Sequence, residues 1–174
     1  MNRKSQSGFT LLEIVIVGAI LIILVTIGGP GLQDFIKNNR ILAQTNVFMV
    51  SVKTARSEAM TQRVPVRFCG SSDGATCTGT WSEGHIAFTD NDGNGAVNGD
   101  DILFLNNRTE APDINVTYSG GNFILFDRRG RAVGSSGNLL FCDDRGSDYA
   151  RGITVDPIGR SKTTAGVLDC GEGG

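Results

Sequence analysis

The sequence predicts an α+β fold in which one long N-terminal helix packs on antiparallel β-sheet. Three observations predict it. An apolar segment at residues 9–27 leads into a second stretch, residues 32–62, with helical periodicity. From residue 64 onward, short apolar runs alternate with Gly, Asn, Asp and Ser, which is typical of strands and turns. No strand–helix–strand alternation follows, so we expect an antiparallel sheet.

The apolar segment at residues 9–27 is long enough to cross a bilayer. At about 1.5 Å per residue, a helix of this length spans roughly 28 Å, close to the hydrocarbon thickness of a membrane. Arg3 and Lys4 precede the segment, which favours a cytoplasmic N-terminus. A secretory signal peptide and a plain membrane anchor are the simplest interpretations.

Two details of this segment argue against those interpretations. A signal peptide should end in small residues of the Ala-x-Ala type, which residues 28–31 match poorly. Glu13 is the only charge in the segment, and a charge inside a membrane costs roughly 2.5 kcal/mol or more, which makes it a functional candidate. Cleavage after Gly8 would create an amine on Phe9, and this amine or a neighbour's would be a natural partner for the carboxylate.

Residues 32–62 continue the helix and carry two apolar stripes. The stripes consist of Phe35, Leu42 and Met49, and of Phe48, Val52, Ala55 and Ala59. Two stripes indicate a helix that is covered on more than one side, by its own sheet and by neighbouring subunits. Joined to the apolar segment, this stretch predicts one helix of about fifty residues with a weak point at residues 28–31.

The rest of the chain reads as strands separated by turns. Strands are expected at residues 64–69, 85–89, 102–105, 115–118, 123–126, 139–142, 152–155 and 158–162. The runs at residues 122–127 and 138–142 are continuously apolar, which predicts that both strands are central in a sheet. No internal repeat is apparent, and the length suits one domain carried on an anchor.

Composition limits the chemistry and the partners. The formal net charge is −2, so binding to nucleic acid or anionic lipid must come from a local patch. His85 is the only histidine, which offers little for a Ser-His-Asp or Cys-His site. No phosphate-cradling Gly-Lys-Ser/Thr loop occurs either. The sequence therefore predicts a protein that is not an enzyme.

All four cysteines follow the apolar segment, at Cys69, Cys77, Cys142 and Cys170. An even number in an exported domain indicates two disulfides, for which three pairings exist. The pairing that is local in sequence joins Cys69 to Cys77 and leaves Cys142 to hold the C-terminal tail through Cys170. A zinc site is the alternative, but no Cys-x-x-Cys spacing is present.

An acidic loop at residues 90–101 is a candidate calcium site. Asp90, Asp92 and Asn94 place oxygen atoms at alternate positions, as in the first half of an EF-hand loop. Asp101 stands at the twelfth position, where a glutamate would reach further. The flanking segments are expected to be strands, so the alternative is an Asn/Gly-rich hairpin loop without metal. No other cofactor is expected.

Basic residues gather late in the chain. They are Arg128, Arg129, Arg131, Arg145, Arg151, Arg160 and Lys162. Such residues bind phosphates weakly and in a salt-sensitive way. Aspartates between residues 143 and 169 offset part of this charge. The alternative interpretation is a set of solvated charges at strand edges.

The start of the chain resembles a known processing signal. Residues 8–13 read Gly8-Phe9-Thr10-Leu11-Leu12-Glu13. This stretch resembles the class III signal of type IV pilins and type II secretion pseudopilins. The resemblance implies that a prepilin peptidase cleaves between Gly8 and Phe9 and methylates the Phe9 amine. It also implies that Glu13 helps to recruit and register subunits as they leave the membrane, and that Pro30 lies where pilins commonly kink the helix.

The same resemblance implies an organisation and a location. Residues 1–8 would be the leader peptide, residues 9–31 the membrane-spanning helix that later enters the filament core, and residues 32–174 a pilin-like periplasmic domain. The protein would begin as a single-pass protein of the bacterial inner membrane and end in a pilus or pseudopilus. Its partners would be major and minor pilins, the prepilin peptidase and the inner-membrane assembly platform.

Two later runs resemble the FimT/FimU and GspH subgroup of these proteins. The first is Ala55-Arg56-Ser57-Glu58-Ala59, which is followed by a strand that ends in Cys69. The second is Gly159-Arg160-Ser161-Lys162, which resembles the Gly-Arg-x-Arg motif of the FimT type associated with DNA capture in natural transformation. Lysine at the last position keeps the charge but not the bidentate guanidinium fork.

This subgroup resemblance implies three functions. The first is a minor type IV pilin at the start or tip of a pilus, the second a GspH-type pseudopilin of type II secretion, and the third a DNA receptor. For double-stranded DNA, the residues implied are Arg160 and Lys162, with Arg151 and Arg145 as further basic candidates.

Overall fold

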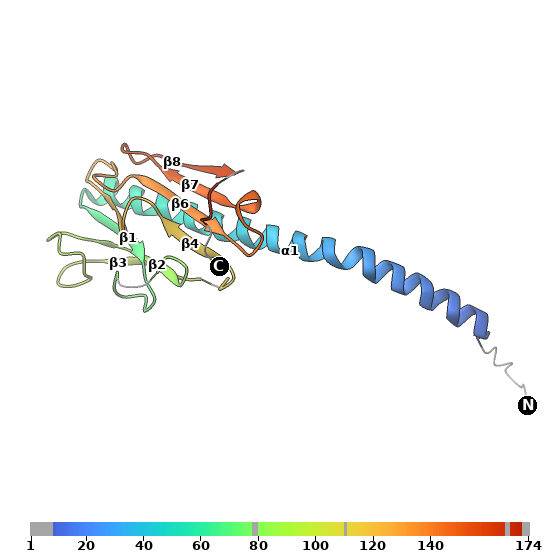
Figure 1. Ribbon diagram of the computed structural model, residues 1–174. Helices are drawn as coiled ribbons and strands as arrows, with labels where there is room; N and C mark the ends of the chain where they lie inside the picture. Colours follow the sequence, from blue (N-terminus) through green and yellow to red (C-terminus); the bar gives the residue numbers. More distant parts are fainter. Residues whose placement is uncertain (1–8, 78–79, 110, 166–167, 172–174) are drawn as a thin grey trace, which may run out of the picture. The chain divides into compact units, whose positions relative to one another are not determined.

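The computed structural model describes residues 9–77, 80–109, 111–165 and 168–171, apart from the side chains of residues 27–30. Within these residues one α-helix, α1 (Leu11–Gln62), precedes eight strands and a short 3-10 helix, η1 (Ser147–Tyr149) (Figure 1). The chain divides into two compact units, one ending at Asn39 and the other beginning at Arg40. The predicted α+β class, with a long N-terminal helix and antiparallel sheets, is confirmed.

The helix α1 has a defined beginning and end. Thr10 caps it, since its Oγ1 accepts a hydrogen bond from the Glu13 N–H (3.2 Å) and its carbonyl accepts one from the Ile14 N–H (3.3 Å). Arg63 follows the last turn with φ 57°, the left-handed conformation that ends many helices. Between these ends the helix continues through residues 28–31, where the sequence predicts a weak point.

The N-terminal part of α1 has the properties of a membrane span. Among the described residues, α1 is the only helix long and apolar enough to cross a bilayer, judged by length and composition. From residue 11 to residue 26, every residue except Gly18 is exposed, and most are large and apolar. Such a surface is costly in water, so this part of α1 requires an apolar environment outside the chain.

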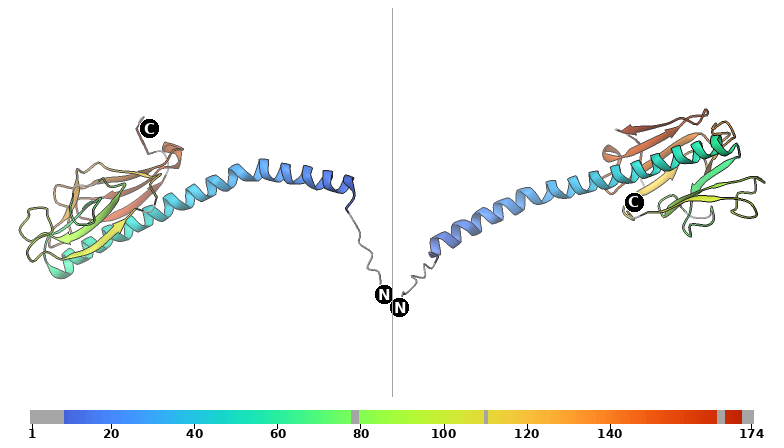
Figure 2. Two further views of the ribbon diagram at one scale, coloured as in Figure 1. Left: turned by 90° about the horizontal axis from the view of Figure 1, so that it is seen from below. Right: turned by 180° about the vertical axis from the view of Figure 1, so that it is seen from behind.

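The eight strands form two antiparallel four-stranded sheets (Figure 2). The first has the order β3 (Leu103–Arg108), β2 (Gly84–Thr89), β1 (Val66–Gly70), β5 (Phe123–Phe126). The second has the order β4 (Asn115–Tyr118), β6 (Gly137–Cys142), β7 (Arg151–Val155), β8 (Ser161–Ala165). All pairings are antiparallel, because consecutive strands are joined by turns and loops rather than by crossover helices.

The main core lies between the C-terminal half of α1 and the two sheets. The stripe predicted at Phe48, Val52, Ala55 and Ala59 is fully buried there. Phe48 contacts Phe68 of the first sheet and Phe141 of the second, with ring centroids 6.4 and 5.1 Å away. The helix therefore joins the sheets through one aromatic cluster, and edge-to-face packing contributes beyond the area it buries.

Three sequence-based expectations differ from the structure in detail. The other predicted stripe is exposed at Phe35 and Leu42, and only Met49 is buried. The strand predicted at residues 158–162 is instead β8, because residues 156–160 form the turn that precedes it. The prediction that residues 122–127 form a central strand is wrong, since β5 lies at the edge of the first sheet. The matching prediction for residues 138–142 is confirmed, since β6 is an inner strand.

Candidate functional site

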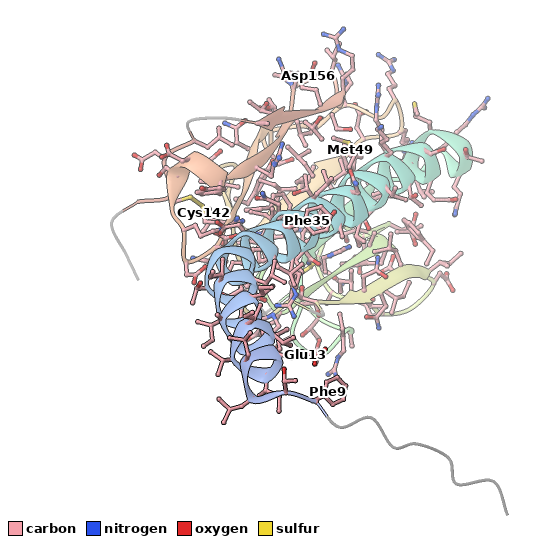
Figure 3. The ribbon with its side chains drawn as sticks, turned by 90° about the vertical axis from the view of Figure 1, so that its right-hand side faces the viewer. Phe9, Glu13, Phe35, Met49, Cys142 and Asp156 are labelled. Atoms are coloured by element: carbon pink, nitrogen blue, oxygen red, sulfur yellow. A yellow bond between two sulfur atoms is a disulfide. The ribbon has the colours of Figure 1, made fainter. Side chains whose placement is uncertain are left out.

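Phe9 and Glu13 lie at the N-terminal end of α1 (Figure 3). Gly8, on the other side of the expected cleavage point, lies outside the described residues. Phe9 is 79% exposed, and Glu13 is exposed in the first turn of the helix. Locally, Thr10-Leu11-Leu12-Glu13 has the form of a capping box, with the acid three residues after the cap. Helix capping therefore gives Glu13 a local structural role as well as the functional role implied by the resemblance.

The four cysteines form the two disulfides that the sequence predicts. Cys69 is bonded to Cys77, and Cys142 to Cys170, with Cα–Cα distances of 5.6 and 6.0 Å. Cys69 is fully buried with Ile86 and Phe88, in a small second core on the far face of the first sheet. The second disulfide holds the C-terminal tail, where the Cys170 N–H also donates to Ser147 Oγ (3.1 Å). No thiol remains for zinc.

The acidic loop connects β2 to β3 as a hairpin loop. Oxygen atoms of Asp90, Asp92 and Asp101 lie within 4.8 Å of one another, which is the start of a cation site. The Asp90 carboxylate is fully buried and is paired with the Arg67 guanidinium at 2.7 Å, so this acid already has a cation. Asp101 accepts hydrogen bonds from loop N–H groups, among them that of Asn91 (3.1 Å).

Asn94 also spends its oxygen inside the loop. Its Oδ1 accepts from the Ala96 N–H (2.7 Å), and its N–H donates to Asp92. Hydrogen bonds therefore satisfy the loop internally, although the carboxylate oxygens retain lone pairs for a cation. The geometry suits the hairpin interpretation, and calcium binding stays a prediction.

Arg160 and Lys162 lie together at one end of the second sheet. With Thr154, Asp156 and Ser161 they line a shallow cavity of about 430 Å³. The Arg160 side chain is 72% exposed, and its Nε donates to the Asp156 carboxylate at 2.9 Å. This part of the predicted DNA site is therefore one accessible cationic surface.

Arg145 does not belong to this surface, contrary to the prediction. Its side chain is 9% exposed, lies over the Tyr149 ring (4.1 Å) and is paired with Asp143 at 2.6 Å. Asp143 follows Cys142, which lies at the opposite end of the second sheet from Asp156 (Figure 3). The Arg145 guanidinium is therefore held in a structural ion pair away from Arg160.

Arg151 is also separated from Lys162, contrary to the prediction. It begins β7 and pairs with Phe141, whereas Lys162 pairs with Thr154 near the other end of that strand. Because side chains alternate along a strand, Arg151 shares the face of buried Ile153, and Lys162 lies on the opposite face. The cationic surface must therefore be built without Arg151.

A repeated turn, which the sequence analysis missed, forms the surroundings of Arg160. Residues 127–131 and 156–160 share the pattern Asp-x-x-Gly-Arg. In both, the glycine N–H donates to the aspartate carbonyl (2.8 Å), and the aspartate carboxylate pairs with the arginine that ends the turn, at 2.7 and 2.9 Å. Gly130 and Gly159 have φ values of 71° and 78°, which side-chain-bearing residues rarely adopt.

Arg56 of α1 connects the two turns. Its Nε donates to the Gly130 carbonyl (2.9 Å) and its Nη2 to the Ile158 carbonyl (3.1 Å). The turns are in direct contact, because a Cβ added to Gly159 would lie 1.8 Å from the Gly130 oxygen. Arg56, which the sequence alone suggests is a solvated helix residue, therefore bridges a turn of the first sheet and a turn of the second.

His85 is buried and has no catalytic arrangement. It is 1% exposed, its Nε2 is hydrogen-bonded to Ser51 Oγ (2.8 Å), and Asn107 Nδ2 lies 3.3 Å away. Its Nδ1 has no hydrogen-bond partner within the described part of the chain. Burial lowers the pKa of His85 to about 4. A nucleophile would need an accessible serine and a base oriented by a third group, and neither is present at this pair.

Comparison with known proteins agrees with this architecture. The family described as Type II transport protein GspH matches residues 44–159. The type IV minor pilin FimU of Pseudomonas aeruginosa strain PAO1 is structurally similar, with a TM-score of 0.55, 16% identity, and coverage of 77% of this chain and 99% of that chain. A second crystal form of FimU gives 0.53, 15%, 71% and 92%.

A protein from a secretion system is similar to the same degree. The minor pseudopilin EpsH, from the Type 2 Secretion System of Vibrio cholerae, has a TM-score of 0.54 and 10% identity, and the match covers 72% of this chain and 97% of that chain. At these identities the structural matches establish the fold alone. No curated protein sequence matches the chain. Because the family match spans more than half of the sequence, the chain belongs to the GspH family of type IV minor pilins and pseudopilins.

Proposed function

We propose that this chain is a minor subunit of a type IV pilus that assists the start of assembly at the filament tip. The observation that carries the proposal is the division of α1 into an exposed apolar part up to residue 26 and a buried stripe from Phe48 to Ala59. A bilayer covers the apolar part before assembly, and the helices of neighbouring subunits cover it afterwards. The role is structural rather than enzymatic.

The proposal includes the processing steps implied by the leader motif. A prepilin peptidase cleaves between Gly8 and Phe9 and methylates the new amine, and the globular domain lies in the periplasm. The subunit then meets major and minor pilins at the inner-membrane assembly platform. The mature chain would start at Phe9, so the carboxylate of Glu13 would lie close to its own N-terminus and to that of a neighbour.

Mass spectrometry of the mature protein tests the processing steps. The full chain, expressed with and without an active prepilin peptidase, should begin with methylated Phe9 only when the peptidase is present. A Gly8→Ala variant tests whether the cleavage depends on the glycine, and we expect it to keep its leader. Cleavage near residues 28–31 would instead identify an ordinary signal peptide and contradict the proposal.

The second candidate is a GspH-type pseudopilin of a type II secretion system, which the family description favours. Deletion of the gene distinguishes the two. Loss of surface pili with normal protein secretion supports the pilus. Loss of secretion with normal pili supports the pseudopilus.

A third candidate function, binding of double-stranded DNA, is favoured by one observation. Arg160 and Lys162 are exposed and line one cavity, although the whole chain is slightly acidic. A gel shift with the full chain in non-ionic detergent, at low and at physiological salt, should show binding that weakens as salt rises. Binding that is unchanged in an Arg160→Ala/Lys162→Ala variant would remove this assignment.

A further inference from the structure

The two Asp-x-x-Gly-Arg turns present more positive charge than the Gly-Arg motif alone. Arg128 and Arg129 lie in the first turn at exposed positions, and Arg131 ends it with a 52% exposed side chain. Within the described residues, the side chains of Arg128, Arg129 and Lys162 make no hydrogen bond or ion pair. These three cations are therefore available to a ligand.

The two aspartates of the turns are structural partners and do not cancel this charge. Burial acts to raise the pKa of Asp127, but hydrogen bonds from the Arg131 backbone and guanidinium hold it below its ordinary value. The pKa of Asp156 is lowered in the same way by Arg160. Each carboxylate stays ionised and orients one arginine. With Arg56 between the turns, six basic side chains face two acids in this region.

We propose that the two turns form one surface that binds the phosphate backbone of duplex DNA, so that the first turn contributes as much as the Gly-Arg turn. The inference rests on the DNA-binding function proposed above and extends it to Arg128, Arg129 and Arg131. Contact between Gly159 and the Gly130 carbonyl, together with the two Arg56 hydrogen bonds, holds the turns against each other.

The composition of the turns selects the duplex over single strands. Proteins that bind single strands stack bases on aromatic side chains, and neither turn contains an aromatic residue. The side chains available are guanidinium and ammonium groups, with Pro157 and exposed Ile158 beside them. Such a surface matches the closely spaced phosphates of a duplex and reads little sequence.

Binding of a fluorescent duplex and of a single strand of equal length tests the proposal. The full chain in non-ionic detergent is compared with Arg128→Ala/Arg129→Ala and with Arg160→Ala/Lys162→Ala across a salt series. Each double variant should lower the affinity, and should reduce the slope of log K against log salt by about 2. The native chain should bind the duplex more tightly than the single strand.

A matched control is Arg40→Ala/Arg108→Ala, which removes two exposed cations that line a different cavity. Arg40 lies about 24 Å along α1 from Arg56, so this variant should bind as the native chain does. Normal binding by the first-turn variant alone would overturn the two-turn surface while leaving the Gly-Arg site in place. No duplex binding by the native chain would overturn the DNA function itself, and tighter single-strand binding would overturn the choice of ligand.

Discussion

Glu13 carries two roles that a conservative substitution can separate. As the third residue after the Thr10 cap, it stabilises the start of α1 through the helix dipole and the capping box, and glutamine can serve in that box too. As a partner for a neighbour's amine, it needs its negative charge.

We therefore expect Glu13→Gln to leave the chain inserted in the membrane and cleaved, but absent from filaments. Quantification of the subunit in sheared filaments and in membranes measures this. Thr26→Val is the control, because the Thr26 hydroxyl bonds only to carbonyls of its own helix, at 2.9 and 3.1 Å. Normal incorporation of Glu13→Gln would reduce the residue to a helix cap.

His85 makes the stability of the folded domain depend on pH in the mildly acidic range. Its pKa is about 4 when folded and near 6.5 when unfolded, so the unfolded state binds the proton first. The stabilisation is complete above pH 6.5 and is lost as pH falls towards 4, at up to about 1.4 kcal/mol per pH unit. Its contacts, Ser51, Asn107, Phe48 and Phe68, carry no charge that could retain the proton.

Urea unfolding of the full chain at pH 7 and pH 5 tests this. We expect lower stability at pH 5, and a His85→Asn variant should lose most of that difference. Asp127 and Asp156 have lowered pKa values, so their contributions are present above pH 3.8 and are lost only below it. Equal pH dependence in the native chain and the variant would contradict the role of His85.

At the scale of elements, the β2–β3 loop offers a test between a metal site and an ion pair. Asp90 neutralises a buried arginine, so Asp90→Asn should destabilise the domain by about 3–5 kcal/mol. Asp92 is exposed and bonds within the loop, so Asp92→Asn should cost less than about 1 kcal/mol. Thermal unfolding measures both.

The same measurement settles the calcium prediction. Because Arg67 already balances Asp90, we expect the melting temperature to be the same with chelator and with millimolar calcium. A bound ion would instead raise the melting temperature as its concentration increases. A calcium-dependent rise that disappears in Asp92→Asn would restore the metal site.

The two disulfides should stabilise the domain to different extents. In the chain-entropy description, a loop of 28 residues gives about 3.6 kcal/mol and one of 8 residues about 2.5 kcal/mol. Replacement of Cys142 and Cys170 by alanine should therefore cost more than replacement of Cys69 and Cys77 if entropy dominates. Cys69 is fully buried, so a larger loss for the Cys69/Cys77 pair would show that packing in the second core dominates. Urea unfolding of the two double variants gives the comparison.

Sequence reasoning found the strands but not their neighbours. Runs such as residues 115–118 and 123–126 coincide with β4 and β5 because local composition and turns define a strand's extent. The order within a sheet depends on contacts between distant segments. The apolar run of β5 therefore suggested a central strand, although it pairs only with β1 in its sheet and packs its faces on other parts of the domain.

On the scale of the whole molecule, the division of the helix and the cysteine pairing were predictable, and the charge distribution was not. Arg145 and Arg160 look alike in the sequence, yet one is buried against Asp143 and Tyr149 and the other is exposed. The shared Asp-x-x-Gly-Arg pattern was visible in the sequence and would have marked the two turns. Their contact through Arg56 depends on tertiary packing, which no local pattern reports.

The disulfides impose an order on maturation. Oxidation needs an oxidising compartment such as the bacterial periplasm, so a domain still in the cytoplasm keeps its thiols. Cys77 is synthesised soon after Cys69, whereas Cys170 comes almost last, so the second bond can close only when translation is nearly complete. The early bond can lock the first sheet while export continues, and the late bond then marks a chain that has arrived whole.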